Sequence, residues 1–565
     1  MTNCTRPMRN TAAPIYAPIS VPAEVVAPPE VRDFVVQVTV TVQTDPPMLH
    51  LAWSATAGAD SYRIYRRAPG VGPWGRAVAV LPGDAAGYTD RRVAAGVPYE
   101  YRVVRMQPAV KPLPRRAYGY ATAGIAVPLL EHRGVVLVLV DSLVVTELRE
   151  ELSRLEHDLV GDGWTVIRRD VNRSEEPTAV KALIREIHSV TPLTSVFLLG
   201  HLPVAKSGWL RPDGHDARPF PCDAYYADCS GDWTDIRDLG VGNRAGDGIF
   251  DQQIIPGDVE IALGRVDMAE LPAFLPLSEI DLLRRYLNKN HCYRHGVLSA
   301  AARAIIDDNF GVFRGEAFAQ NGWRNFAPLL GPSQIRAGKW NATGTERYLW
   351  GYGCGPGGHV SCGGVAATAE LAQQAPSILF TFLFGSYFCE WDVPDALQRA
   401  VLAWPDGGLI CGWAGRPNWF IHGMALGQTI GDGVRLAQRN SHWHYQPTNG
   451  SPRGVHIALM GDPTLRLHIV PPPADLAAQR RPDGLFLTWL PALPPVLGYL
   501  VYRAVAWNGP YTRLTPELVT DPTYCDAHPS RDAASYMVRA VTLTTSPSGS
   551  YYNASQGIFV TIEGD

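Results

Sequence analysis

Apolar runs alternate with amphipathic stretches through the middle of the chain. Residues 135–140 form a continuous apolar run, residues 147–159 repeat apolar side chains at helical spacing, and residues 164–169 have the pattern of a strand. A helical pattern over 178–188 and an apolar strand over 194–199 continue the series. Strands that alternate with helices in this way predict a parallel sheet with helices on both faces. Further apolar strands are predicted at 259–263, 304–306, 348–352, 377–384 and 408–412.

The two ends of the chain carry a different pattern, and it is the same at both ends. The sequence LAW at 51–53 returns as LTW at 487–489, and YRIYR at 62–66 returns as YLVYR at 499–503. Each copy alternates apolar and polar residues in short runs separated by turn residues, which is typical of a β-sandwich. The spacing of the Trp and of the Tyr-containing strands resembles that of fibronectin type III modules.

These patterns divide the chain into four parts. Residues 1–34 are rich in Pro, Ala and Val and predict an extended arm. Residues 35–128 and 471–565 are the predicted β-sandwich modules, and residues 129–470 are the predicted α/β core. Modules of the fibronectin type favour an extracellular or cell-surface location, although the N-terminal segment lacks the apolar centre of a signal peptide.

Charge and apolar content exclude two functional classes. Fifty basic and 54 acidic side chains give a formal net charge of −4, so binding of nucleic acid through its phosphates is not expected. The longest apolar run, residues 134–145, contains Asp141 and is too short to cross a bilayer, so no transmembrane segment is expected. The nine cysteines are an odd number and are spread thinly along the chain, which argues against a disulfide framework. No C-x-x-C pair occurs among them, which argues against a structural zinc knuckle. Nothing in these numbers predicts an oligomeric state.

Polar and glycine-rich segments follow several of the predicted core strands. His201 comes directly after the strand over 194–199, and the segments 353–359 and 385–392 follow two later strands. In open α/β sheets, ligands bind beyond the carboxyl ends of the strands. A thiol or hydroxyl on one of these loops and an imidazole on a neighbouring loop would supply a nucleophile and its base.

Four segments of the core resemble the gingipain-type cysteine peptidases, a branch of the caspase-like fold. They are VFLLG at 196–200, DAYY at 223–226, IALGRVD at 261–267 and GDPTL at 461–465. The resemblance covers the core at 129–470 and implies a caspase-like architecture with a mostly parallel sheet. It also implies a cysteine-type endopeptidase that acts on a protein or peptide.

The catalytic positions depart from the pattern of that family. The family carries Gly-His-Gly after one strand and a nucleophilic Cys after the next. Here a Gly-Cys-Gly places Cys354 at the first position, and Ser386 stands at the second. A shifted arrangement keeps both residue types, because His359 and Cys389 lie a few residues further along the same loops. In this hypothesis His359 deprotonates Cys389, and the thiolate attacks a peptide carbonyl.

The altered positions also allow a second hypothesis, in which the chain is a degenerate peptidase without activity. Its core and flanking modules would then bind a protein or glycan partner or act as a scaffold. The imidazole of His359 distinguishes the two hypotheses. A ring within reach of Cys389 or Ser386 favours an enzyme, and a ring that points elsewhere favours a binding protein.

One loop of the core is a candidate calcium site. Asp235, Asn243, Asp247 and Asp251 lie in a segment whose centre is NRAGDGIFD. Ca²⁺ prefers several carboxylate and carbonyl oxygens on a flexible loop that contains Gly, and this segment matches that chemistry loosely. The alternative is that these side chains form turns by binding their own backbone.

Two further sets of residues are weaker candidates for zinc. Neither set has a familiar ligand spacing, although both combine His with other metal-binding side chains. They are Asp213, His215, Asp216 and Cys222 in one loop, and His442 with His444 in another.

Overall fold

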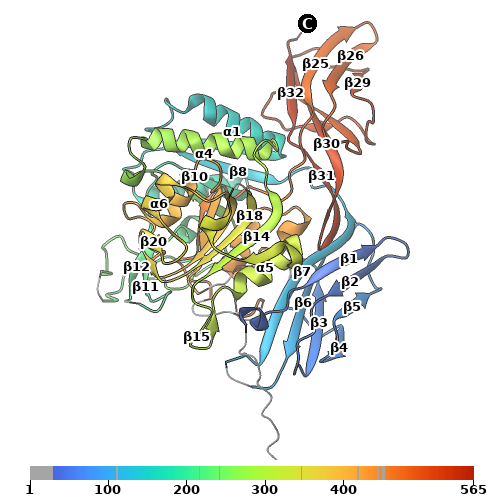
Figure 1. Ribbon diagram of the computed structural model, residues 1–565. Helices are drawn as coiled ribbons and strands as arrows, with labels where there is room; N and C mark the ends of the chain where they lie inside the picture. The colour runs from blue at the N-terminus through green and yellow to red at the C-terminus, as the bar shows by residue number, and fades with distance from the viewer. Residues whose placement is uncertain are drawn as a thin grey trace, which may run out of the picture.

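The computed structural model describes residues 30–564 except 71, 110, 111, 216, 241, 345, 417, 418, 442, 443 and 448–451. Most of the predicted arm at 1–34 lies outside the described residues, and its last part, Val31–Phe34, forms the 3-10 helix η1. Figure 1 shows a layered α/β core with two β-sandwich modules along one side of it. No helix in the described part of the chain is long and apolar enough to cross a membrane.

A ten-stranded sheet forms the centre of the core. Most neighbouring strands pair in parallel, and β24 runs antiparallel to β23. The prediction of a mixed α/β fold with a mostly parallel sheet is confirmed at this level. β13 begins later than the apolar run at 259–263 predicts. Val259 is apolar because it is buried, but it lies in the loop that precedes the strand. In spatial order the strands are β17 (Ile335–Ala337), β14 (Ala301–Asp308), β18 (Tyr348–Cys354), β22 (Ile378–Phe384), β23 (Ile410–Trp413), β24 (Ala458–Gly461), β13 (Ala262–Val266), β10 (Leu193–Leu199), β8 (Gly134–Asp141) and β9 (Trp164–Val171).

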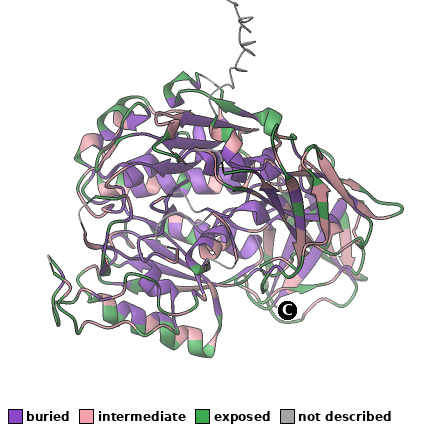
Figure 2. Ribbon diagram, turned by 90° about the horizontal axis from the view of Figure 1, so that it is seen from below, coloured by how far each residue is buried: buried purple, intermediate pink, exposed green. Residues whose placement is uncertain are grey.

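Helices cover both faces of this sheet because each presents an apolar stripe to it. Leu155 and Ile184 belong to one hydrophobic cluster, and Phe326 and Val434 belong to another. All four side chains are buried, and burial of a side chain of this size stabilises the fold by about 1.5–3 kcal/mol. Figure 2 shows that the strands of the core are buried and that exposed residues lie on its outer helices and loops. The helices are α1 (Arg149–Gly161), α2 (Pro177–Val190), α3 (Ala224–Ala227), α4 (Glu279–Arg294), α5 (Gln320–Leu330), α6 (Thr368–Gln373), α7 (Leu397–Leu402) and α8 (Ile430–Arg439).

The two β-sandwich modules share side-chain contacts as well as a strand pattern. The ring centroids of Trp53 and Tyr62 lie 5.2 Å apart in the first module, and those of Trp489 and Tyr499 lie 5.3 Å apart in the second. These are the Trp and Tyr of the sequence repeat, and they fill the core of each module. The strands are β1 (Thr39–Gln43), β2 (Met48–Ala52), β3 (Ser61–Arg67), β4 (Ala79–Pro82), β5 (Gly87–Asp90), β6 (Tyr99–Met106) and β7 (Arg116–Val127) in the first module, and β25 (Ala474–Arg481), β26 (Gly484–Leu490), β27 (Gly498–Ala504), β28 (Thr512–Arg513), β29 (Thr523–Asp526), β30 (Ala534–Ser546), β31 (Gly549–Ala554) and β32 (Ile558–Ile562) in the second.

The modules join edge to edge. β7 of the first module pairs in parallel with β31 of the second, so that Gly124 lies opposite Gly549. The larger sheets of the two modules thereby form one nine-stranded sheet, and Figure 1 shows the two modules stacked through this contact. A Cβ at Gly549, whose φ is +125°, would lie 2.1 Å from the carbonyl oxygen of Gly124. The close approach of the two edge strands therefore requires glycine at this position.

Glu100 of β6 connects the first module to the core. Its buried carboxylate accepts hydrogen bonds from Arg67 at 2.8 Å, from the imidazole of His422 at 2.7 Å and from the hydroxyl of Tyr445 at 2.7 Å. Burial opposes ionisation, but His422 and Arg67 outweigh it and lower the pKa of Glu100 to about 2. The carboxylate is therefore charged and fully paired at neutral pH.

Asp162, which follows α1, connects the second module to the core. Its carboxylate lies 2.7 Å from the guanidinium of Arg466, 3.4 Å from Arg133, 3.7 Å from Arg294 and 3.9 Å from Arg539 of β30. Burial opposes ionisation, but these guanidinium groups outweigh it and lower the pKa of Asp162 to about 2. One buried carboxylate thus holds together elements of the core and of the second module.

Candidate functional site

Several strands of the core end at one common edge of the sheet. Asp267 follows β13, and its carboxylate lies 2.9 Å from the Nδ1 atom of His201, which follows β10. The same carboxylate accepts a hydrogen bond at 3.5 Å from Arg399, which lies in the helix that comes after β22. The carboxyl ends of β10, β13 and β22 therefore meet at the edge where α/β sheets bind ligands.

The turn after β22 holds Ser386 in a tight backbone environment. Tyr387, the next residue, has a φ of +67°, in the left-handed region that a bulky side chain rarely adopts. Gly357 of the neighbouring loop approaches so closely that a Cβ on it would lie 2.2 Å from the carbonyl oxygen of Ser386. Backbone strain of this kind is concentrated at functional sites, and here it lies next to the half-buried Ser386.

The imidazole that faces Ser386 is that of His215. Its Nε2 atom lies 2.7 Å from the hydroxyl oxygen of Ser386, and its ring stacks on Tyr387 with the centroids 4.8 Å apart. Asp213 fixes the His215 loop, because its carboxylate accepts hydrogen bonds from the backbone N–H groups of His215 and Tyr387. A hydroxyl at this distance from an imidazole has the geometry of a nucleophile and its general base.

His359 has a different partner. Its Nε2 atom lies 2.8 Å from the carboxylate of Glu390, which also forms an ion pair of 2.6 Å with Arg218. Cys389 is 1% exposed, and burial together with the nearby charges of Asp213 and Glu390 raises the pKa of its thiol well above the ordinary value. The structure thus pairs His359 with Glu390 and leaves Cys389 as a buried thiol. Catalysis by His359 and Cys389 stays a prediction.

Cys354 stands at the end of β18, inside the core. Its side chain is fully buried, and burial with the nearby charge of Asp308 raises the pKa of its thiol well above the ordinary value. A buried neutral thiol cannot take a proton from Ser386 as an imidazole can. Of the two positions that the family resemblance implies, only Ser386 is brought beside an imidazole here.

In the predicted calcium loop, the carboxylates bind backbone N–H groups. Asp235 accepts from Gly246 and Gly248, Asp247 accepts from Arg244 and Ile249, and Asp251 accepts from Ile236 and Arg237. The amide of Asn243 is buried and donates to the carbonyl oxygens of Gly208 and Phe250. The contact of Asp247 with Ile249 is that of an Asx turn, and the contacts of Asp235 and Asp251 join segments more than ten residues apart within the loop. Calcium binding at this loop stays a prediction.

The structure describes only some of the residues of the two zinc candidates. Asp216 and His442 lie outside the described residues. Cys222 is fully buried, and burial raises the pKa of its thiol. His215 and Asp213 take part in the contacts with Ser386 and Tyr387 instead. From the sequence, His215 is a candidate only for zinc, because nothing in its local pattern connects it with a serine 171 residues away.

Comparisons with known proteins provide no family for the chain. No protein-family model and no curated protein sequence matches it. Among solved structures, an Fn3-like protein from Clostridium thermocellum is 26% identical over 15% of this chain and 93% of that protein, with a TM-score of 0.12.

Two further solved structures are pectate lyases. PelI from Erwinia chrysanthemi is 17% identical over 19% of this chain and 32% of the lyase, with a TM-score of 0.14. Pel3 from Pectobacterium carotovorum is 15% identical over 19% of this chain and 34% of the lyase, also with a TM-score of 0.14. The chain thus spans about a third of the length of these lyases, and at such TM-scores the similarities carry no argument about function.

Proposed function

We propose that the chain is a serine-type hydrolase of peptide or related acyl bonds, built on a gingipain-like, caspase-like core. Ser386 is the nucleophile and His215 is its general base. The observation that carries the proposal is the distance of 2.7 Å between the Ser386 hydroxyl and the His215 imidazole. Both groups lie at the ligand-binding edge of the sheet, and Ser386 is at the position where the gingipain-type family carries its nucleophilic cysteine.

The reaction follows the usual course for a serine nucleophile. The hydroxyl oxygen of Ser386 attacks the carbonyl carbon of the substrate while its proton passes to Nε2 of His215. The imidazolium then gives this proton to the leaving amine as the acyl bond breaks, which leaves an acyl-enzyme on Ser386. A water molecule, deprotonated by the same imidazole, releases the acid and regenerates the hydroxyl.

Two contacts support the roles of the neighbouring residues. The strained backbone at Tyr387 and the close approach of Gly357 both lie next to Ser386. Asp213 ties the His215 loop to the Ser386 turn through two backbone N–H groups. Asp213 is therefore a positioning residue, because it holds the base by its backbone and does not contact the reacting hydroxyl.

A non-catalytic binding protein is the second candidate function. It is favoured by the contact of the His359 imidazole with Glu390 and by the burial of both Cys354 and Cys389. In this alternative the same edge of the sheet, flanked by the fibronectin-like modules, binds a protein or peptide without cleaving it.

The test is covalent labelling of the folded protein, followed by peptide mapping. A fluorophosphonate and peptidyl electrophiles that carry Arg, Lys, Asp or Asn are added in turn, with and without Ca²⁺. We expect an adduct on Ser386 that is lost in Ser386→Ala and in His215→Gln. His359→Gln and Ser361→Ala are the matched controls, and both should retain the adduct.

Other outcomes overturn the proposal in distinct ways. An adduct on Cys389 that His359→Gln abolishes would identify the cysteine dyad instead. Labelling that requires Ca²⁺ would indicate that the reactive state depends on a bound ion, for which the loop at 235–251 is the candidate site. Protein that is folded by circular dichroism and reacts with none of the probes would favour the binding function.

A further inference from the structure

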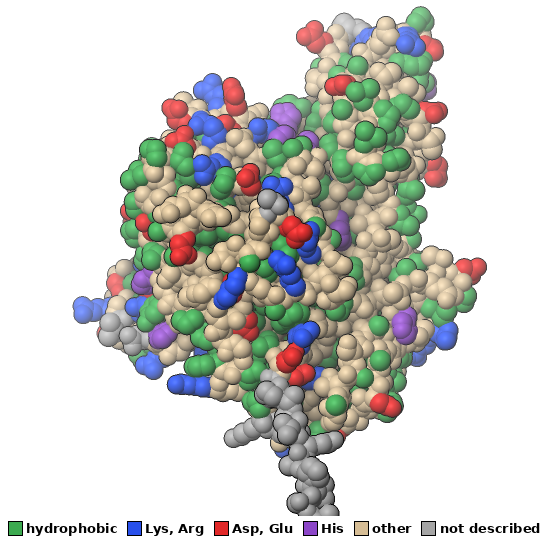
Figure 3. Space-filling model, viewed as in Figure 1, with side chains coloured by type: hydrophobic (Ala, Val, Ile, Leu, Met, Phe, Trp, Pro, Cys, Tyr) green, Lys and Arg blue, Asp and Glu red, His purple; other side chains and the backbone are tan. Residues whose placement is uncertain are grey.

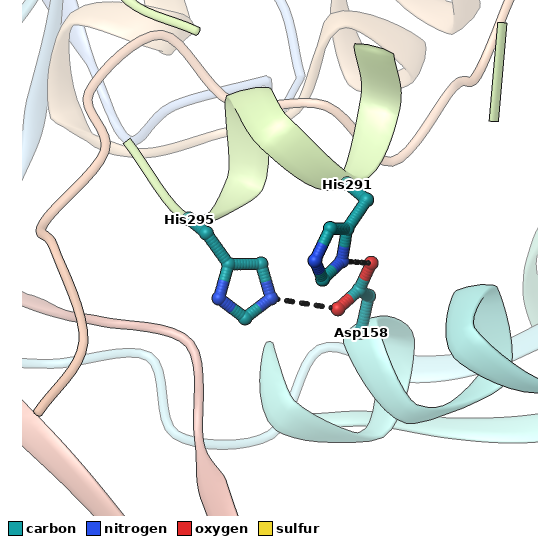
Figure 4. Close-up of side chains that lie close together, drawn as sticks. All are labelled: Asp158, His291 and His295. Carbon is teal, nitrogen blue, oxygen red and sulfur yellow. Dashed lines mark hydrogen bonds and ion pairs between the residues drawn. The ribbon is translucent and has the colours of Figure 1, made fainter. Parts of the chain in front are cut away.

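A second group of reactive side chains lies between helices α1 and α4. His291 lies in the last turn of α4, and His295 directly follows that helix, so their four-residue spacing puts both rings on one side of it. Asp158 of α1 faces them. Its two carboxylate oxygens lie 2.8 Å from Nδ1 of His291 and 2.8 Å from Nε2 of His295, as Figure 4 shows. One carboxylate thus gathers two imidazoles from a neighbouring helix.

The three side chains offer the donor set and the spacing of a transition-metal site. One ligand atom from each residue lies within 4.8 Å of the other two. Around a tetrahedral Zn²⁺ with bonds of about 2.0–2.1 Å, ligand atoms are about 3.3 Å apart. To reach that arrangement the side chains must rotate so that the two hydrogen bonds lengthen and the imidazoles come closer together. Two imidazoles and one carboxylate favour zinc over Ca²⁺ or Mg²⁺, which prefer oxygen ligands only.

Burial and charge at the cluster also suit a cation. The side chain of Asp158 is 5% exposed, whereas those of His291 and His295 are 31% and 23% exposed. The carboxylate therefore lies on the protein side, and the imidazoles lie at a boundary that water and ions reach. The site thus combines one buried oxygen donor with two nitrogen donors that an ion can reach from solvent.

The guanidinium of Arg294 is held mainly by carboxylates other than that of Asp158. Arg294 lies between the two histidines in sequence, and its guanidinium binds the carboxylate of Asp462 at 2.6 Å and lies 3.7 Å from that of Asp162. These two carboxylates therefore balance most of its positive charge, and Asp158 adds a smaller electrostatic contribution. His157, the neighbour of Asp158, is also engaged elsewhere, because its ring stacks on Trp507 of the second module with the centroids 4.0 Å apart.

We propose that Asp158, His291 and His295 bind one Zn²⁺ ion, with water in the fourth position. α1 and α4 each follow a strand of the sheet and return along it, so their last turns lie at the edge opposite Ser386. The ion is therefore separate from the proposed hydrolase site. It links α1 to α4 directly beneath the second module, and its role is to stabilise that junction.

The first test uses the full-length protein after removal of metals with EDTA. Added Zn²⁺ should bind with one ion per chain by mass spectrometry of the metal content, and it should raise the melting temperature by several degrees. Co²⁺ should give the visible absorption of a tetrahedral site with nitrogen ligands. Failure of Zn²⁺ at tens of micromolar to bind, or octahedral Co²⁺ only, would overturn the proposal.

Variants then locate the ion. His291→Gln, His295→Gln and Asp158→Asn should each weaken Zn²⁺ binding by about 10–100-fold or more. His157→Gln on the same helix is the matched control, and His215→Gln removes the other zinc candidate; both should leave the affinity unchanged. Loss of binding in His215→Gln alone would move the ion to the Ser386 region. Circular dichroism checks that each variant is folded. If a variant is not folded, the Co²⁺ spectrum of the wild-type protein tests whether the site is tetrahedral with nitrogen ligands.

Discussion

The carboxylate of Glu100 accepts a hydrogen bond from the imidazole of His422, 322 residues further along the chain. This contact joins a strand of the first module to the 3-10 helix η5 (His422–Leu426) of the core. Both side chains are almost fully buried, so the module is held to the core by hydrogen bonds to a buried carboxylate as well as by apolar packing. An unpaired charge at such a position is costly, because neither water nor another group replaces the lost partner.

Removal of the Glu100 carboxylate should therefore be strongly destabilising. Glu100→Ala leaves Arg67 and His422 buried without their acceptor, and we expect a loss of about 3–5 kcal/mol in the free energy of unfolding. Urea denaturation followed by Trp fluorescence measures it. Glu30→Ala is the control, because the Glu30–Arg32 ion pair is exposed and should contribute less than about 1 kcal/mol. Equal effects of the two changes would contradict the assigned role.

The cysteines should differ sharply in their reactivity. Cys292 and Cys525 are partly exposed, whereas Cys354, Cys389 and Cys411 are buried. Burial raises the pKa of Cys411 to about 12 and that of Cys389 well above its ordinary value, so little thiolate forms near pH 8. We expect iodoacetamide to label Cys292 and Cys525 in the folded protein, and to label Cys354, Cys389 and Cys411 only after denaturation. Rapid labelling of native Cys389 would instead indicate an activated thiol.

The junction between the modules should depend on one glycine. Gly549→Ala places a Cβ 2.1 Å from the carbonyl oxygen of Gly124 and should separate β7 from β31. We expect faster proteolysis near residues 545–555 and a lower melting temperature. Gly58 also has a positive φ, +76°, but no atom lies within 4 Å of an added Cβ. Gly58→Ala thus reports the backbone strain alone, and a matching loss in both variants would rule out a special role for the junction.

Acid should destabilise the protein before its carboxylates are protonated. Burial lowers the pKa of His456 to about 4, and burial together with Arg466 lowers that of His468 to about 4. The unfolded chain binds these protons near pH 6.5, so the stability contribution is complete above pH 6.5 and is lost as the pH falls towards 4. Each histidine adds a slope of up to about 1.4 kcal/mol per pH unit. Melting curves from pH 7 to 4.5 should show a shallower decline in His468→Gln. The same decline in both proteins would argue against a neutral, half-buried His468 in the folded protein.

Local sequence patterns predict the elements of the core well. The apolar run at 194–199 and the helical pattern at 178–188 correspond to β10 (Leu193–Leu199) and α2 (Pro177–Val190) within one or two residues. Such elements are encoded by the period of their side chains, which is a local property. The Trp and Tyr of the terminal repeat likewise predict the module cores, because the same two rings pack together in each copy.

Local side-chain patterns do not predict contacts between segments that are distant in the sequence. The family resemblance places Ser386 at the nucleophile position after a strand, but its partner His215 comes from a loop whose path no local pattern describes. The zinc ligands were missed for a related reason. The four-residue spacing of His291 and His295 was a readable signal, whereas the approach of Asp158 depends on the packing of α1 against α4. The sequence does not predict the parallel pairing of β7 with β31 either. Gly124 and Gly549 permit a close approach of two backbones, but nothing in the sequence shows which strand each one approaches.

On the surface, opposite charges are interspersed on the face shown in Figure 3, where Lys and Arg alternate with Asp and Glu. This agrees with the near balance of 50 basic and 54 acidic side chains. Mixed surface charge of this kind favours solubility and disfavours non-specific association with polyanions.

The pairing of β7 with β31 sets an order of events during synthesis. β7 ends at Val127, and its partner β31 begins at Gly549, so the ribosome must add more than four hundred residues before the edge of the first module is covered. Until then, β7 presents unpaired backbone groups to any other strand in its vicinity, including the β7 of a second nascent chain. The last strands to emerge therefore act as the cap of the first domain to fold, and a chain truncated before Gly549 would be prone to dimerise or aggregate through that edge.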